Sequence, residues 1–290
     1  MGKLMRAMQL NSFSPDYKGL SVVDVQKPTL RKGEILIRVT CAPVNPSDLM
    51  MLAGNYIMYK EPPFIPGLVA VGKVVESNAG FLGNILMSRR VVFTPSEGKG
   101  GTWTEFAVSN PKLCVPLESQ LASEDAVNLL SNAATAIGLM DTIRKHRCST
   151  VIVTAAASEV GRMLNTMAPK YGVKLINIVR SQEQISVLQE IGAQYILDMT
   201  VDGFANQLKH LAHEMKASLA IDAIAGEMPN ILMESMPERS TIIILGRLSG
   251  NNIIFDGLKQ LVGKQHTLRG FSINDWFVQK NIISCPGAYP

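Results

Sequence analysis

The hydrophobic pattern divides the chain into two halves of different character. From Met5 to about Pro116, short β-branched runs are separated by Pro and Gly residues, which is typical of a small barrel or sandwich. Helical periodicity is nearly absent in this half. The predicted strands cover residues 34–39, 69–75, 90–93 and 104–108.

The second half alternates between strand and helix patterns. Apolar residues recur at helical spacing over residues 123–145, and further helices are predicted over 159–171, 183–191 and 204–215. Between them lie short, almost continuously apolar runs, which indicate strands over residues 150–154, 174–179, 195–197, 219–223 and 241–245. This alternation predicts an α/β domain with a doubly wound parallel sheet.

Composition narrows the range of partners. The net charge of +4 is small and the Lys and Arg residues are scattered along the chain, so we expect no nucleic-acid partner. No apolar run approaches the roughly 18 residues of a membrane span, and the first residues lack the features of a secretion signal, so no membrane partner is expected either. The cysteines are widely spaced, which favours free thiols and a cytoplasmic location; they are Cys41, Cys114, Cys148 and Cys285.

A turn of small residues follows the first strand of the α/β half. Ala155, Ala156, Ala157 and Ser158 precede Glu159, Val160 and Gly161, where a helix is expected to begin. Small residues let backbone N–H groups approach a pyrophosphate, and the start of a helix favours an anion. Simple packing explains such a turn equally well, because the G-x-G-x-x-G pattern is missing.

The end of the second strand refines this hypothesis. An acid at this position would hold the ribose 2′-hydroxyl of NAD, whereas this chain carries Arg180 and Ser181. A guanidinium with a neighbouring hydroxyl suits a 2′-phosphate, so NADPH is the favoured cofactor. The alternative is an arginine that is merely solvated at the end of a strand.

An ordered series of motifs resembles the zinc-free medium-chain dehydrogenase/reductase family, nearest to mitochondrial-type 2-enoyl thioester reductases and NADPH:quinone reductases. The series runs through Asn45-Pro46-Ser47-Asp48, Gly54-Asn55-Tyr56, Pro66-Gly67, Gly101-Thr102-Trp103, Asn132 with Thr135-Ala136, Ala155 to Gly161, Asn177 to Arg180, and Leu268 to Phe271 with Trp276. The resemblance implies a GroES-like substrate domain over residues 1–118 and a Rossmann dinucleotide-binding domain over 119–267. It also implies that residues 268–290 begin a return to the substrate domain, shorter than in relatives.

The resemblance also implies roles for individual residues. Tyr56 would be the proton donor, and Asn45 and Thr135 would lie near the nicotinamide and the substrate. The residues expected to contact NADPH are Ala155, Ser158, Val160, Gly161, Arg180, Ser181, Gly246, Phe271 and Ser272. An alternative for Tyr56 is a loop aromatic that only packs against the β-rich domain.

The expected reaction is hydride transfer to an activated double bond, followed by protonation. Quinone reduction is the alternative within enzymes, and a cofactor-binding protein without turnover is the alternative outside them. No metal is expected, because Pro66-Gly67-Leu68-Val69 stands where zinc-dependent relatives carry Gly-His-Glu.

Two further expectations concern Glu159 and the oligomer. A carboxylate at residue 159, where the family has Gly or Ala, would repel a bound pyrophosphate unless it turns to solvent. The apolar residues 241–245, followed by 251–255, predict an exposed edge strand, and with the family resemblance they predict a homodimer.

Overall fold

The computed structural model describes residues 3–14, 16–56 and 60–280, and the chain forms two compact units. The first unit comprises Met1–Ser131 and the second Asn132–Pro290. The boundary between the units therefore follows residue 131, whereas the sequence placed it after residue 118. Residues 119–131 group with the first unit. None of the helices in the described ranges combines the length and the apolar character that crossing a lipid bilayer requires.

The first unit is built from antiparallel sheets. β1 (Leu4–Leu10) and β2 (Leu20–Gln26) form a two-stranded sheet. A five-stranded sheet has the order β6 (Phe106–Ser109), β3 (Ile35–Cys41), β4 (Ala70–Ser77), β5 (Arg90–Phe93) and β7 (Cys114–Pro116). Alternating side chains from β3, β4 and β5 form its core, as period-two patterns require. The β-rich character predicted for this half is confirmed.

Short helices interrupt this unit where almost no helix was expected. They are α1 (Pro46–Leu52) and α2 (Gly80–Leu86); a third short helix, α3 (Ser123–Ala126), lies where a helix was expected to begin. Each has at most two turns, so apolar residues recur too few times to reveal a helical period. For α1 a different signal was available: Asn45 at the N-cap, Pro46 at the first helical position and an acid at Asp48.

The second unit contains a six-stranded parallel sheet. Its order is β10 (Tyr195–Asp198), β9 (Lys174–Val179), β8 (Thr150–Val153), β11 (Leu219–Asp222), β12 (Thr241–Ile244) and β13 (Thr267–Gly270). The chain runs outward from β8 to one edge and then outward from β11 to the other. This is the Rossmann order, with the switch point between β8 and β11. Residues 268–270 belong to this sheet rather than to the return segment that the resemblance implied.

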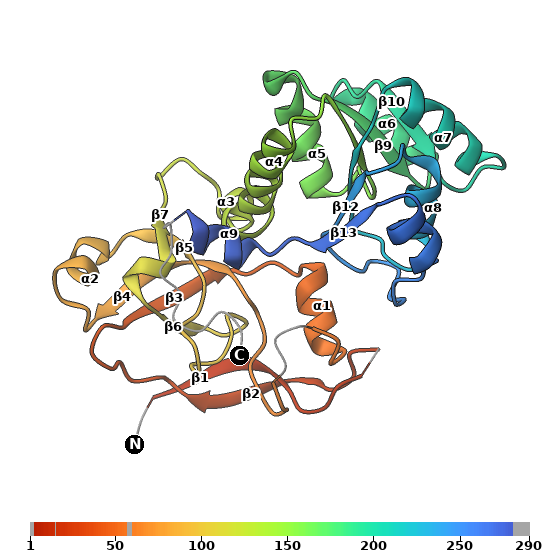
Figure 1. The fold of residues 1–290 in the computed structure, drawn as a ribbon. Helices are drawn as coiled ribbons and strands as arrows, with labels where there is room; N and C mark the ends of the chain where they lie inside the picture. Colours follow the sequence, from red (N-terminus) through yellow and green to blue (C-terminus); the bar gives the residue numbers. More distant parts are fainter. Residues whose placement is uncertain (1–2, 15, 57–59, 281–290) are drawn as a thin grey trace. The chain divides into compact units, whose positions relative to one another are not determined.

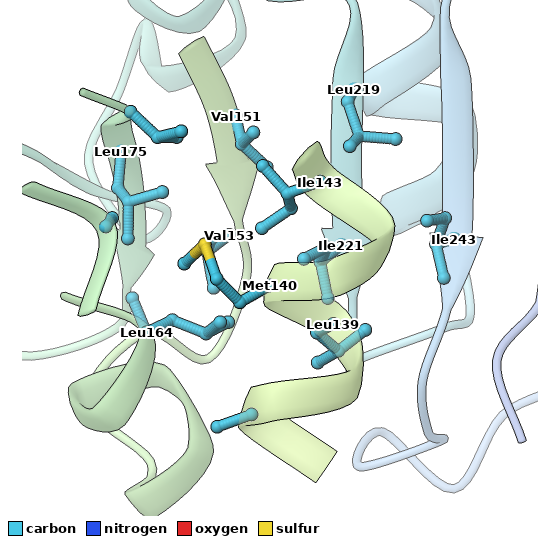
Figure 2. Packing of buried hydrophobic residues seen from close by; sticks show 14 of the residues in the cluster. Leu139, Met140, Ile143, Val151, Val153, Leu164, Leu175, Leu219, Ile221 and Ile243 are labelled. Atoms are coloured by element: carbon cyan, nitrogen blue, oxygen red, sulfur yellow. The ribbon is translucent and has the colours of Figure 1, made fainter. Parts of the chain in front are cut away.

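Helices cover both faces of the parallel sheet (Figure 1). Val151 and Val153 of β8 pack on one side with α4 (Ala134–His146), α5 (Glu159–Met167) and α6 (Gln182–Glu190), as Figure 2 shows for the first two helices. Ile152 points the other way, to α7 (Phe204–Glu214) and α8 (Met228–Ser235). Because both faces are covered, these strands are apolar throughout, which is why the sequence revealed them.

One helix predicted in this half is divided in the structure, and another helix was missed. The helix expected over residues 123–145 is divided into α3, a π-helical turn over Leu129–Ala133, and α4. α8 was not predicted from the sequence. Met228 and Met233 are buried in the core and lie on a helix whose apolar residues leave little polar face to mark a period.

The edge strand expected for a dimer is also different. β12 lies inside the sheet between β11 and β13, and residues 251–255 form no strand. The edge strand on this side of the sheet is β13, whose residues 267–270 are mostly exposed and carry little of the apolar pattern that marks a strand.

A partly exposed ion cluster holds α9 (Ile273–Gln279) against α4. The Asp141 carboxylate accepts a hydrogen bond from Trp276 Nε1 at 3.1 Å, and Lys145 and Lys280 Nζ lie 3.2 and 3.1 Å from its Oδ2. Burial raises the pKa of Asp141, but the hydrogen bonds from Trp276, Lys280 and Lys145 outweigh it and lower the pKa from 3.8 to about 2. The ionised carboxylate therefore stabilises the folded state.

We expect Asp141→Asn to lower the free energy of unfolding by about 1–2 kcal/mol at pH 7, because charge-assisted hydrogen bonds are lost. Since the folded-state pKa is lowered, this contribution is present above pH 3.8 and disappears as the pH falls toward 2. Denaturant unfolding of wild type and variant at pH 7 and at about pH 3 measures the difference. Asp202→Asn, at an exposed aspartate, is the matched control. An equal loss at both pH values would show that ionisation of Asp141 is unimportant.

Candidate functional site

The cofactor candidates follow the parallel strands at one edge of the sheet. The turn at Ala155 follows β8, Arg180 and Ser181 follow β9, Gly246 follows β12, and Phe271 follows β13. Parallel strands point their carboxyl ends in the same direction, so these residues lie along one edge. The switch point between β8 and β11 is on this edge, where open α/β sheets bind ligands.

The turn after β8 is a tight turn in which an alanine adopts a backbone conformation that favours glycine. Ala155 adopts φ +48°, in the left-handed region that favours glycine, and Ser158 Oγ caps α5 by accepting from Gly161 N at 3.3 Å. A Cβ on Gly161 would lie 2.3 Å from the Ala156 carbonyl oxygen, so glycine alone allows this helix–strand contact. Backbone N–H groups at the start of a helix, here including that of Val160, point toward the side where an anion can bind.

Arg180 and Ser181 occupy the end of the second strand as predicted. Arg180 is exposed, and its backbone N–H donates to Gln184 Oε1 at 3.0 Å. Its guanidinium takes part in no salt bridge within the described ranges. Ser181 is the N-cap of α6 and accepts from Gln184 N at 3.4 Å. A hydrogen bond from Ser181 lowers the pKa of the exposed Glu183, so an acid also lies near this end.

A buried polar pair at the switch point escaped the sequence interpretation. Thr154 Oγ1 donates to Asp222 Oδ1 at 2.7 Å, and the N–H groups of Ile224 and Ala225 donate to the same carboxylate at 3.1 and 2.8 Å. Asp222 is fully buried, which raises its pKa. Gly246 lies next to this loop, since its missing Cβ would be 3.4 Å from the Ala223 carbonyl oxygen.

The last cofactor candidates lie where β13 leads into α9. The N–H of Phe271 donates to the Ile244 carbonyl at 3.0 Å, and Ser272 caps α9 by accepting from Asp275 N at 3.2 Å. A Cβ on Gly138 of α4 would lie 2.7 Å from the Phe271 ring. Thr135 stands near the start of the same helix, partly buried. The packing of Phe271 on Gly138 thus fixes this stretch against the helix that carries Thr135.

In the first unit, Asn45 and Tyr56 flank α1. Asn45 is its N-cap, and the Asp48 carboxylate accepts from Asn45 N at 2.8 Å. Asp48 is 1% exposed and its Oδ1 has no hydrogen-bond partner within the described part of the chain; burial raises its pKa. Sequence reasoning gave Asp48 no role, although its spacing from Asn45 matches a capping box.

Tyr56 follows the turn that ends α1. Gly54 adopts φ +73°, and a Cβ there would lie 2.9 Å from the Phe13 ring, so the turn requires glycine. Asn55 N donates to the Met50 carbonyl at 2.8 Å, which keeps the turn against the helix end. Tyr56 is partly buried and has interacting neighbours, and residues 57–59 lie outside the described ranges.

Two separated motifs meet beside Asn45. Gly101 N, Thr102 N and Trp103 N donate to the backbone carbonyls of residues 65–67 at 2.8–3.1 Å. A Cβ on Gly67, at φ +103°, would lie 2.4 Å from Thr102 Oγ1. Trp103 Nε1 then donates to the Pro43 carbonyl at 3.2 Å, two residues before Asn45. These motifs therefore position the Asn45 loop.

The structure places Glu159 against a partner instead of in open solvent. Asn132 Nδ2 donates to Glu159 Oε2 at 2.7 Å, so the carboxylate is held by a side chain of the same unit. Asn132 belongs to the π-helical turn that precedes α4. The π-helical turn interrupts the helix expected over residues 123–145. It carries Asn132, whose side chain reaches Glu159, the first residue of α5.

Within the described ranges, no group of three or more His, Cys, Asp or Glu side chains is arranged to hold a metal ion. Cys41, Cys114 and Cys148 are free thiols, whereas Cys285 lies outside those ranges.

Both halves of the chain match known families. Residues 31–119 match the alcohol dehydrogenase GroES-like domain, and residues 160–283 match the zinc-binding dehydrogenase model. The mitochondrial enoyl-(acyl-carrier-protein) reductase of Caenorhabditis elegans is 28% identical over an aligned length of 292 residues, gaps included. The alignment covers 97% of this chain and 82% of that protein.

Solved structures share the fold. A Mesorhizobium loti protein, provisionally named an NADPH:quinone reductase, gives a TM-score of 0.89 at 26% identity. The matched region covers 97% of this chain and 85% of the M. loti chain. A mycobacterial protein crystallised with NADPH gives a TM-score of 0.81 at 23% identity, with coverages of 96% and 87%. The second likeness concerns the fold alone.

Proposed function

Because the chain belongs to the medium-chain dehydrogenase/reductase family, we propose that it is an NADPH-dependent reductase that transfers hydride to an activated double bond such as that of a 2-enoyl thioester. The observation that carries this proposal is the carboxyl edge of the parallel sheet, where the Ala155–Gly161 turn and Arg180 follow neighbouring strands. The C. elegans relative supports the substrate class through its name.

The residues along this edge fit a dinucleotide. The left-handed Ala155 turn and the Gly161 contact leave only small side chains and backbone N–H groups before α5, which suits a pyrophosphate. Ser158 caps the helix start, and Gly246, Phe271 and Ser272 would border the nicotinamide end. The exposed Arg180 and the Ser181 hydroxyl would hold a 2′-phosphate, which favours NADPH over NADH.

Replacing Arg180 by Ala should weaken NADPH binding by about 1–3 kcal/mol and leave NADH binding nearly unchanged, because a charge-assisted contact with the 2′-phosphate is lost. Fluorescence titration with each cofactor measures the two dissociation constants. Lys209→Ala removes an exposed positive charge from α7 and serves as the control for net charge. Equal weakening of both cofactors would show that Arg180 does not distinguish them.

The bound nicotinamide would supply the hydride, and this chain would supply the proton. The Tyr56 hydroxyl is the proposed general acid for the enolate that remains after hydride addition. The Gly54 turn and the Asn55–Met50 hydrogen bond hold the backbone that precedes it against the end of α1. Asn45, fixed by Asp48 and by the Trp103–Pro43 hydrogen bond, and Thr135 would orient the substrate and the nicotinamide.

We expect Tyr56→Phe to lower kcat for an enoyl thioester by about 10²–10⁴-fold, the range for loss of a general acid. NADPH affinity should be unchanged, because the substitution keeps the ring. Tyr171→Phe, at an exposed tyrosine in the second unit, is the control. Full enoyl reductase activity in the Tyr56 variant would remove the assignment of Tyr56.

Quinone reduction is the second candidate, favoured by the likeness to the M. loti protein. Quinone oxygens can take protons from water, so Tyr56→Phe should hardly affect this activity. Assays of the same preparations with an enoyl thioester and a small quinone therefore separate the two reactions. NADPH binding with turnover of neither substrate would favour the non-catalytic role.

We also propose a homodimer, formed through β13 and the connection between β12 and β13. The support is an edge strand with unpaired backbone groups, next in sequence to apolar side chains that face solvent. Leu258 is 77% exposed, and Ile254 and Val262 are 60% and 68% exposed.

The cellular compartment of the protein stays a prediction: the free thiols favour the cytoplasm, whereas the C. elegans relative is mitochondrial.

Light scattering at micromolar concentration should give twice the mass of the chain. Leu258→Asp combined with Val262→Asp should yield monomers, because two charges would be buried in the contact. Val201→Asp places a charge on an exposed apolar residue elsewhere in the same unit and should leave the dimer intact. A monomeric wild-type protein would contradict the proposal.

A further inference from the structure

α2 in the first unit presents an apolar face to solvent. Gly83 and Leu86 point to the core, while the opposite side of the helix carries large hydrophobic residues. Phe81 is 78% exposed, although burial of such a ring is normally favourable. The exposed apolar side chains of this segment, which we call the α2 face, are Phe81, Leu82, Ile85 and Met87.

Positively charged segments surround the α2 face. The connection between β2 and β3 lies beside the start of α2, since Gly33 N donates to the Asn78 carbonyl at 2.8 Å. The 3-10 helix Pro111–Leu113 packs against α2 as well. Residues 27–34, 73–90 and 109–116 together contain seven Lys or Arg and two Glu. Their excess of five positive charges exceeds the net charge of +4 of the whole chain.

The two acids in these segments do not neutralise the exposed cations around the face. Glu34 pairs with Lys99 at 3.1 Å, and Glu76 pairs with Lys27. The remaining exposed cations form no salt bridge within the described part of the chain. They are Arg31, Lys32, Lys73, Arg89 and Lys112.

From this juxtaposition we propose that the α2 face docks the protein on an anionic lipid surface. A helix with exposed apolar side chains and cations in the neighbouring segments matches the headgroup region of a membrane, where rings enter the interface and cations meet lipid phosphates. A second copy of the chain would oppose the same positive charges, which disfavours self-association here.

This inference is independent of the proposed reductase activity. The α2 face contains none of the candidate cofactor or catalytic residues, so its substitution should leave reduction of a water-soluble substrate unchanged. That activity serves as the measure of intact folding in the experiment.

Co-sedimentation of the full chain with phosphatidylcholine vesicles, with and without phosphatidylserine, tests the proposal. We expect binding to the anionic vesicles only, weakened by added salt. Phe81→Ser with Ile85→Ser should abolish it, whereas Val22→Ser, at a residue 66% exposed on β2, should not. Neutralising Arg31 and Arg89 with Gln should weaken binding about fivefold per charge, and Gln at Lys170 and Lys209 should have little effect.

Three outcomes would overturn the proposal. They are the absence of wild-type binding to anionic vesicles, equal binding by wild type and the Phe81/Ile85 variant, and equal binding to both vesicle types. A change in oligomeric state caused by the Phe81/Ile85 variant, without vesicle binding by wild type, would instead assign the face to contact between copies.

Discussion

The edge of the sheet that carries the cofactor candidates depends on one buried carboxylate. Asp222 ends β11, and a charge or a polar group this deeply buried is costly unless it is bonded. Here the Thr154 hydroxyl at the end of β8 and two backbone N–H groups of the next loop satisfy it. The two strands on either side of the switch point are thereby joined at the place where the chain must leave the sheet in two directions.

The turn after β8 relies on this junction. Thr154 Oγ1 also accepts from Ala223 N at 2.9 Å, so the residue before the turn is held from both sides. Ala155 and Ala225 adopt left-handed conformations at φ +48° and +61°, each costing about 1 kcal/mol for a residue with a Cβ. Such conformations persist when neighbouring bonds determine them. Alanine can thus stand where a dinucleotide turn commonly uses glycine.

The sequence predicted what repeated along it and missed what depended on distant residues. Strands β8, β9 and β11 were visible because burial on both faces makes them apolar throughout, and the turn at Ala155–Gly161 because its residues are small and adjacent. The Thr154–Asp222 bond joins residues 68 positions apart, and a lone acid at a strand end carries no local signal. β13 escaped because an edge strand with exposed side chains needs no apolar pattern.

The short helices were missed in the sequence for a related reason. α1 and α2 are too short to show a period, yet α1 carries a readable capping pattern at Asn45, Pro46 and Asp48. α2 has no side-chain cap, and only the structure shows that its apolar residues face outward. A hydrophobic run in a sequence is ordinarily interpreted as core, so exposed helices of this kind are the elements that pattern reasoning misplaces.

Glu159 shows how one departure from a motif changes the charge balance of the whole site. Its carboxylate lies in the first turn of α5, where the helix dipole favours an anion, and Asn132 fixes it at 2.7 Å. The acid therefore links the starts of α4 and α5, which carry Thr135 and Ser158. It also occupies part of the positive potential that a pyrophosphate would use, and Glu183 does the same at the start of α6. Arg180, at the end of β9 on the same edge, carries a positive charge that offsets these two acids.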